Sequence, residues 1–113
     1  MEQADSTVVR NDAENHRYVI ELDGVLTGYT VDHLRGGLHF FVHTETISGF
    51  EGRGVAHTLV KAALDDVRSR GQKIVPLCPY VAGFLKKNPE YDDIVDHQMW
   101  DRIEERPHID DPG

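Results

Sequence analysis

The chain has 113 residues, a length that predicts one domain, and 39% of them are hydrophobic. Its formal net charge of −8 argues against non-specific nucleic-acid binding, because such binding depends on lysine and arginine side chains that neutralise phosphates. The sequence has no apolar run near the ~20 residues of a membrane helix, and its single cysteine, Cys78, excludes an intrachain disulfide. We therefore expect a cytoplasmic protein that binds neither nucleic acid nor membranes.

The first part of the chain has the alternating pattern of β-strands. A short strand is predicted at Thr7–Arg10, a second at Arg17–Leu22 and a third at Val25–Leu34, interrupted at Gly28. Asp23-Gly24 favours a hairpin between the second strand and the third. Together with the strand that follows, these segments predict an antiparallel meander.

The fourth predicted strand, Leu38 to Thr44, is followed by a candidate catalytic carboxylate. Alternation places His39, Phe41, His43 and Glu45 on one face. A carboxylate or a histidine at the end of a central strand can deprotonate an amine, so Glu45 and His43 are candidate general bases. The alternative is structural: Glu45 interacts with the next turn, and His43 is a half-buried, hydrogen-bonded residue.

The segment Glu51-Gly52-Arg53-Gly54-Val55-Ala56 opens an amphipathic helix predicted over residues 54–70, with Gly71 as its C′ residue. Two glycines let the backbone approach a ligand closely. The start of a helix presents unpaired N–H groups and the positive end of its dipole. This turn is therefore a candidate site for an anion such as a phosphate or a pyrophosphate.

A mostly apolar strand, Lys73 to Cys78, is predicted to return to the sheet parallel to its neighbour. Because proline cannot donate a hydrogen bond to a strand ladder, we expect the two strands to separate near Pro76. A short helix at Tyr80–Lys87 ends before Pro89. We expect a core over about residues 7–100 and a frayed tail over 101–113.

Five sequence blocks resemble the GCN5-related N-acetyltransferase superfamily, in particular its small single-domain YjdJ-like or NATD1-like members. They are His43-Thr44-Glu45, Glu51 to Ala56, Leu59-Val60-Lys61-Ala62-Ala63-Leu64, Val75-Pro76-Leu77-Cys78-Pro79-Tyr80-Val81 and Asn88-Pro89-Glu90-Tyr91. The resemblance implies an α/β fold of the mixed α+β kind. An antiparallel meander leads into strand–helix–strand, two parallel strands splay into a V, and helices pack on the sheet. It also implies acetyl-CoA as cofactor, with the pantetheine arm in the V and the pyrophosphate on the amides of the glycine turn.

The superfamily pattern at this turn is Gln or Arg, two residues, Gly, any residue, and Gly or Ala. Gly54 and Ala56 match it, whereas Glu51 stands where Gln or Arg is usual. We expect the Glu51 carboxylate to point to solvent and Arg53 to be a charge partner of the pyrophosphate. The expected cofactor-binding residues are Ile47, Gly52, Arg53, Gly54, Val55, Ala56, His57, Cys78 and Asn88. No metal site is expected, since the sequence has one cysteine and no His-Glu-x-x-His helix.

The implied activity is acetyl transfer from acetyl-CoA to a primary amine of a small molecule or peptide, by direct attack in a ternary complex. We expect a monomer or a weak homodimer. Tyr80 is a candidate donor to the leaving sulfur or, alternatively, a core aromatic residue. Cys78 is a buried small residue, a contact of the pantetheine arm or an acyl carrier. Two further functions stay open: a CoA or acyl-CoA binding module without transfer, and a Cys78-dependent CoA enzyme.

Overall fold

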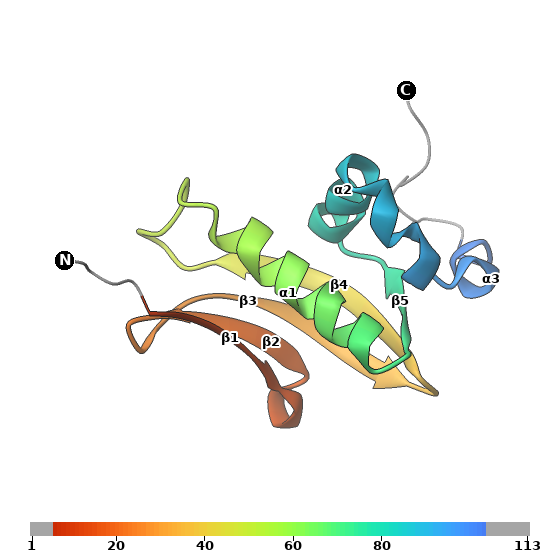
Figure 1. Ribbon diagram of the computed structural model, residues 1–113, viewed down its shortest axis with the longest axis horizontal. Coiled ribbons are helices and arrows are strands. Elements are labelled where there is room, and N and C mark those ends of the chain that lie inside the picture. The colour runs from red at the N-terminus through yellow and green to blue at the C-terminus, as the bar shows by residue number, and fades with distance from the viewer. Residues whose placement is uncertain (1–5, 104–113) are drawn as a thin grey trace.

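A computed structural model of the chain describes residues 6–103 (Figure 1). Within that range five strands form one mixed sheet in the order β1-β2-β3-β4-β5. Their bounds are Thr7–Asp12, Arg17–Leu22, Val25–Arg35, Leu38–Thr46 and Lys73–Pro76. The first four strands pair antiparallel, and β4 and β5 pair parallel. The predicted α/β class, with a meander followed by strand–helix–strand, is confirmed. Most of the predicted tail, residues 104–113, lies outside the described residues.

Four helical segments follow the meander: α1 (Val55–Ser69), α2 (Pro79–Lys87), the 3₁₀ helix η2 (Pro89–Ile94) and α3 (His97–Trp100). Figure 1 shows α1 lying across one face of the sheet, with α2, η2 and α3 gathered on the β5 side. Gly71 follows α1 with a φ of 67°, which confirms the predicted left-handed C′ residue. None of the helices in the described range is long and apolar enough to cross a membrane.

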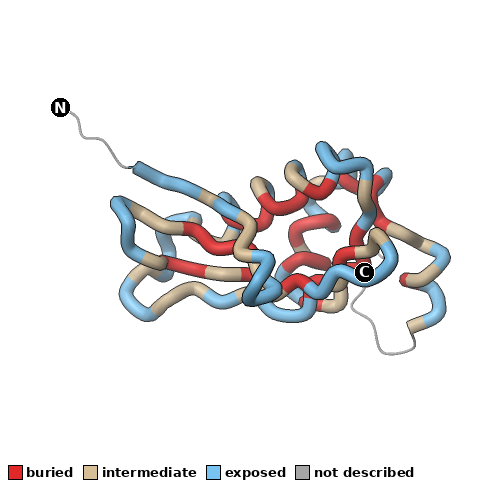
Figure 2. The backbone as a smooth tube through the Cα atoms, turned by 90° about the horizontal axis from the view of Figure 1, so that it is seen from below, coloured by how far each residue is buried: buried red, intermediate tan, exposed pale blue. Residues whose placement is uncertain are grey.

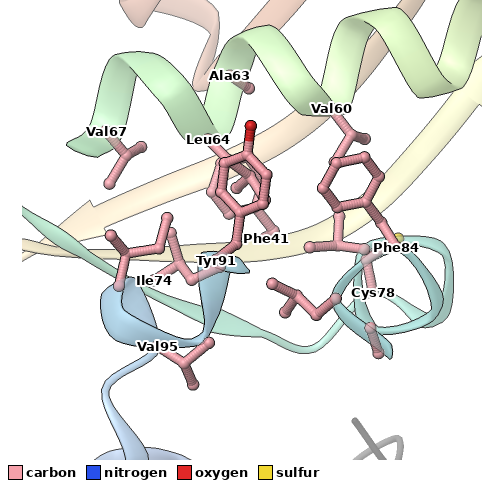
Figure 3. Close-up of a cluster of buried hydrophobic side chains, with 14 of the residues drawn as sticks. Phe41, Val60, Ala63, Leu64, Val67, Ile74, Cys78, Phe84, Tyr91 and Val95 are labelled. Carbon is pink, nitrogen blue, oxygen red and sulfur yellow. The ribbon is translucent and has the colours of Figure 1, made fainter. Parts of the chain in front are cut away.

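The core lies between α1 and the sheet and extends under α2 and η2 (Figure 3). The buried stripe of α1 consists of Leu59, Val60, Ala63, Leu64 and Val67, as its helical spacing predicts. These side chains belong to one apolar cluster with Phe41 of β4 and Ile74 of β5. Figure 2 shows the same division along the backbone, with buried residues on α1 and the central strands and exposed residues at the hairpin turns. This packing fixes α1 over β4, where the candidate site lies.

Strand β3 is continuous where the sequence predicted an interruption at Gly28. The irregularity is a β-bulge at the preceding residue, because Ile20 pairs with Gly28 while Glu21 pairs with Leu26. Gly28 serves the approach of α1 instead. A Cβ at this position would lie 2.9 Å from Val55 Cγ1 in the first turn of α1.

The parallel strands separate at the predicted proline. The last residue pair between β4 and β5 is Phe41–Pro76, whereas β4 continues to Thr46. Just beyond, the Cys78 N–H donates to the Phe41 carbonyl oxygen at 2.7 Å. The second half of β4 has no parallel partner among the described residues, so the sheet opens here into the expected V.

A second bulge corrects the predicted faces of β4. Val31 pairs with His43 but Asp32 pairs with Phe41, so Val42 is an extra residue and the alternation changes phase there. His39 and Phe41 face α1, whereas His43 and Glu45 lie on the opposite face, which we call the open face. The prediction that all four residues share one face was wrong, because regular alternation cannot reveal an inserted residue.

Candidate functional site

The inner edge of the V is polar. Thr44 follows the bulge and faces α1, since it pairs with Thr30 and their hydroxyl oxygens lie 2.9 Å apart. Across the V, the Cys78 sulfur lies 3.3 Å from the Thr44 hydroxyl. The Thr30 hydroxyl donates to the His43 carbonyl oxygen at 3.3 Å. Because each hydroxyl has one proton, Thr44 then donates to Thr30, and the Cys78 thiol donates to Thr44.

These hydrogen-bonded contacts fix the position of Cys78. The side chain is 3% exposed and lies just before the first residue of α2 (Figure 3). Its sulfur lies within hydrogen-bond distance of the Thr44 hydroxyl at the opening of the V. Of its three sequence-based roles, the structure gives the buried position and places the sulfur beside the V.

The glycine turn is open at the backbone level. Gly52 and Gly54 have φ values of 76° and 73°, and no atom lies within 4 Å of a Cβ built on either residue. Gly54 precedes the first residue of α1 and has no side chain with which to cap it. The first N–H groups of α1 therefore face a space that a ligand atom can enter.

Two charged side chains shape this turn. Glu51 is exposed, as predicted, but it also folds back and accepts a hydrogen bond from the Gly49 N–H at 2.9 Å. The Arg53 guanidinium lies 5.5 Å from the centre of the Phe50 ring. The Glu51 carboxylate is thus held by its own loop, and the Arg53 guanidinium packs over the Phe50 ring of the same loop.

Two cavities flank the first turn of α1. The one on the α2 side, which we call the α2 cavity, has a volume of about 430 Å³. It is lined by His57, Pro79, Tyr80, Gly83, Phe84, Lys87 and Asn88. The cavity on the β1–β3 side has about 350 Å³ and is lined by Thr7, Ile20, Leu22, Thr27, Arg53, Gly54, Val55 and Thr58. Five of the nine predicted cofactor-binding residues line these cavities: Arg53, Gly54 and Val55 line the one on the β1–β3 side, and His57 and Asn88 line the α2 cavity.

The remaining predicted residues have defined local contacts. His57 packs its ring 5.3 Å from that of Phe84, and Asn88 donates to the Phe84 carbonyl oxygen at 2.8 Å, which caps the end of α2. Ile47 lies just after β4 and donates its N–H to the Thr27 carbonyl oxygen. Partial burial raises the pKa of the Tyr80 phenol. The phenol is therefore protonated at neutral pH and can donate a proton.

His43 and Glu45 form a pair on the open face of β4. The His43 Nε2 lies 2.9 Å from Glu45 Oε1, and the side chains are 55% and 47% exposed. An ionised carboxylate only accepts, so Nε2 of a neutral His43 carries the proton and its Nδ1 is free to accept one. This is the arrangement of a base and the group that orients it.

Sequence reasoning missed three residues at this site: Thr30, Thr44 and Tyr29. Thr44 by itself matches no sequence motif, and the face of the sheet from which its side chain projects depends on the bulge at Val42. Tyr29 pairs with Glu45, and its ring centre lies 6.3 Å from that of His43 on the open face. Once the hairpin register is known, both threonines and the tyrosine follow from strand pairing alone.

A sheet that splays at one parallel pair, with a glycine turn opening the helix between those strands, defines an acyltransferase-type α/β domain. The chain belongs to the GCN5-related N-acetyltransferase family, whose sequence profile, described as GCN5-related N-acetyl-transferase, matches residues 17–94. It is similar to Protein NATD1 of Xenopus tropicalis, with 31% identity over 99 residues that cover 79% of this chain and 84% of that protein. Protein NATD1 of Gallus gallus is 29% identical over 91 residues, covering 79% of this chain and 83% of that protein.

Proposed function

We propose that the protein transfers an acetyl group from acetyl-CoA to a primary amine by direct attack in a ternary complex. The observation that carries this proposal is the end of β4–β5 pairing at Phe41–Pro76, beside the open turn of Gly54. A strand edge without a partner offers hydrogen bonds to an extended amide-bearing chain such as pantetheine. Family membership adds independent support.

The residues of the turn fit a diphosphate. The two positive-φ glycines leave the backbone uncovered, and the dipole of the 15-residue α1 favours an anion at its first N–H groups. The Glu51 carboxylate accepts a hydrogen bond from the Gly49 N–H, which partly compensates its negative charge beside a bound anion. The α2 cavity then offers apolar and polar surface for the rest of a CoA molecule. When bound, acetyl-CoA supplies an acetyl group activated as a thioester.

The open face supplies the base. The acceptor approaches β4 from this face, and Nδ1 of His43 takes the proton of the attacking amine while Glu45 stabilises the resulting imidazolium. The amine nitrogen forms a bond to the acyl carbon, and the electron pair of the broken C–S bond goes to sulfur. Tyr80, protonated at neutral pH, is the proposed proton donor to that sulfur. The two proton-transfer groups thus act from opposite sides of the V.

The experiment combines calorimetric titration of CoA with an assay of thiol release from acetyl-CoA over a panel of amines. We expect CoA binding and amine-dependent release. His43→Gln lowers kcat on the order of a hundredfold, as loss of a general base does, without weakening CoA binding. The matched control is His97→Gln, because His97 also lies 2.9 Å from a carboxylate, Asp92, but in α3. It leaves both values unchanged.

The alternatives predict other results. CoA binding without amine-dependent release identifies a binding module, and absence of CoA binding removes the proposal. A Cys78-dependent enzyme loses all turnover in Cys78→Ala. Direct transfer retains it, because the thiol is a donor to Thr44 and is not needed as a nucleophile.

A further inference from the structure

A row of paired residues crosses four strands on the open face. Arg10 pairs with Val19, Val19 with Tyr29, and Tyr29 with Glu45. Cross-strand partners project from the same face of a sheet. Tyr29 therefore lies beside the His43–Glu45 pair, with its ring tilted by 57° relative to the His43 ring at a centroid distance of 6.3 Å. An acceptor amine placed at His43 lies within reach of this aromatic ring.

The Tyr29 ring already binds a cation within the protein. The Arg17 guanidinium carbon lies 5.2 Å from the ring centre, within the range of a cation–π interaction. Arg17 is anchored by Asp12 at 3.2 Å, which holds the guanidinium in place. Arg17 thus orients the ring and covers one of its faces, so a ligand cation has to use the other electron-rich face.

Charge on this part of the open face is unbalanced toward negative. Arg10 pairs with Glu21 at 3.4 Å and Arg17 pairs with Asp12. Glu45, in contrast, pairs with the His43 imidazole. The arginines are therefore compensated, whereas one carboxylate beside the aromatic ring is not balanced by a fixed cation among the described residues of this row. Such a surface attracts a cation and opposes a carboxylate.

We propose that the acceptor is an aliphatic primary amine that carries a second positive charge, and that Tyr29 is the specificity-determining residue that holds this second charge. The inference rests on the proposed acetyl transfer and names the substrate class of that site. One nitrogen of the acceptor lies at Nδ1 of His43, and the other lies over the Tyr29 ring beside Glu45. The acceptor therefore enters along the β3–β4 surface, on the side of the sheet opposite α1.

The test uses three amines with the same four-carbon chain. Putrescine has a second ammonium group, butylamine has none, and γ-aminobutyrate carries a carboxylate instead. For the wild-type protein with saturating acetyl-CoA, kcat/KM falls in the order putrescine, butylamine, γ-aminobutyrate. The difference between the first two is about threefold to thirtyfold, the range that one cation–π contact supplies.

Two variants assign this preference to the ring. Tyr29→Leu raises KM for putrescine by that same factor relative to KM for butylamine, so the preference between the two amines is lost, and it leaves CoA affinity unchanged. Tyr29→Phe keeps the ring and keeps the preference. Calorimetric titration of putrescine into the CoA-saturated protein gives a second readout, with binding weakened in Tyr29→Leu and preserved in Tyr29→Phe. Equal melting temperatures of both variants show that the fold is retained.

The outcomes separate the two proposals. If amines are acetylated but putrescine has no advantage, or if Tyr29→Leu keeps the full advantage, the assignment of the acceptor class is overturned and the acetyltransferase proposal stands. If CoA does not bind, or no amine of the panel releases thiol, the proposed function is overturned and this inference with it.

Discussion

Gly54 places the first amides of α1 by adopting a backbone conformation that other residues avoid. Its φ of 73° lies in the left-handed region, which costs an L-residue about 1–2 kcal/mol. The space around its missing Cβ is empty in the protein alone. A side chain at this position therefore causes backbone strain in the free protein. In the complex it would also crowd a bound diphosphate.

We predict that Gly54→Ala weakens CoA binding on the order of tenfold, as expected for a loss of about 1.4 kcal/mol. Calorimetric titration measures the change. The control is Gly71→Ala at the other end of α1, where φ is 67° and the space beyond the Cα is equally empty. Both variants lower the free energy of unfolding, but only Gly54→Ala lowers CoA affinity. Equal affinities in both variants would place the diphosphate elsewhere.

At the scale of elements, the packing of α1 against β3 depends on one missing methyl group. An added Cβ at Gly28 would lie 2.9 Å from Val55 Cγ1, 3.0 Å from the Glu45 carbonyl oxygen and 3.2 Å from Ile20 Cγ2. The backbone oxygen belongs to the β3–β4 ladder and has little freedom to move. Relief of the overlap must therefore come from displacement of the first turn of α1.

We predict that Gly28→Ala lowers the free energy of unfolding by about 1–3 kcal/mol, the usual cost of overpacking a core. Because the displaced turn includes Val55, CoA binding weakens as well. Urea unfolding and calorimetry measure the two effects. Gly83→Ala is the control for the unfolding measurement only, because Gly83 lines the α2 cavity. It lies inside α2 with nothing within 4 Å of the new methyl group, and the substitution raises stability by up to about 1 kcal/mol. A neutral Gly28→Ala would show that α1 is not tightly seated.

Sequence patterns predicted the order and type of the elements because each pattern is local. Alternation in β2, the periodic stripe of α1 and the proline at the end of β5 each depend on a few neighbouring residues. The bulge at Val42 is different, since it exists only relative to β3. No property of the β4 segment alone distinguishes regular alternation from a strand with one extra residue. The candidate bases were therefore found by residue type, but their face was not.

At the scale of the whole molecule, β4 joins two different environments. At its start it is paired on both sides, and His39 is buried there in a chain of polar contacts. The His39 Nδ1 lies 2.8 Å from Asp32 Oδ2, and Nε2 lies 2.6 Å from Gln72 Oε1. These bonds tie β3, β4 and the segment after α1 together at the end of the sheet opposite the V. The sequence pattern placed His39 on the same face as His43. In the fold, His39 lies on the opposite face and links β4 to its neighbours at the end of the sheet away from the V.

Protonation of His39 makes the stability of this end of the sheet depend on pH. Burial by itself lowers the pKa of His39, but the hydrogen bonds to Asp32 and Gln72 and the charge of Asp32 outweigh it, and the net pKa is raised above 6.5 although Arg70 opposes this. Both ring nitrogens face acceptors, which fits the imidazolium. A raised folded-state pKa contributes stability that is complete below the unfolded-state pKa. It is lost as pH rises through the folded-state pKa.

We therefore predict that the free energy of unfolding falls as pH rises above 6.5, and that His39→Gln removes most of this fall. The variant is also less stable at pH 6 by about 3–5 kcal/mol, because Asp32 is left as a buried carboxylate without its charged partner. Urea unfolding at a series of pH values measures both effects. His97→Gln, which alters an exposed histidine–carboxylate pair, keeps the wild-type pH dependence. A pH dependence that survives in His39→Gln would assign the titration to another group and leave the Asp32–His39–Gln72 chain a neutral hydrogen-bonded link.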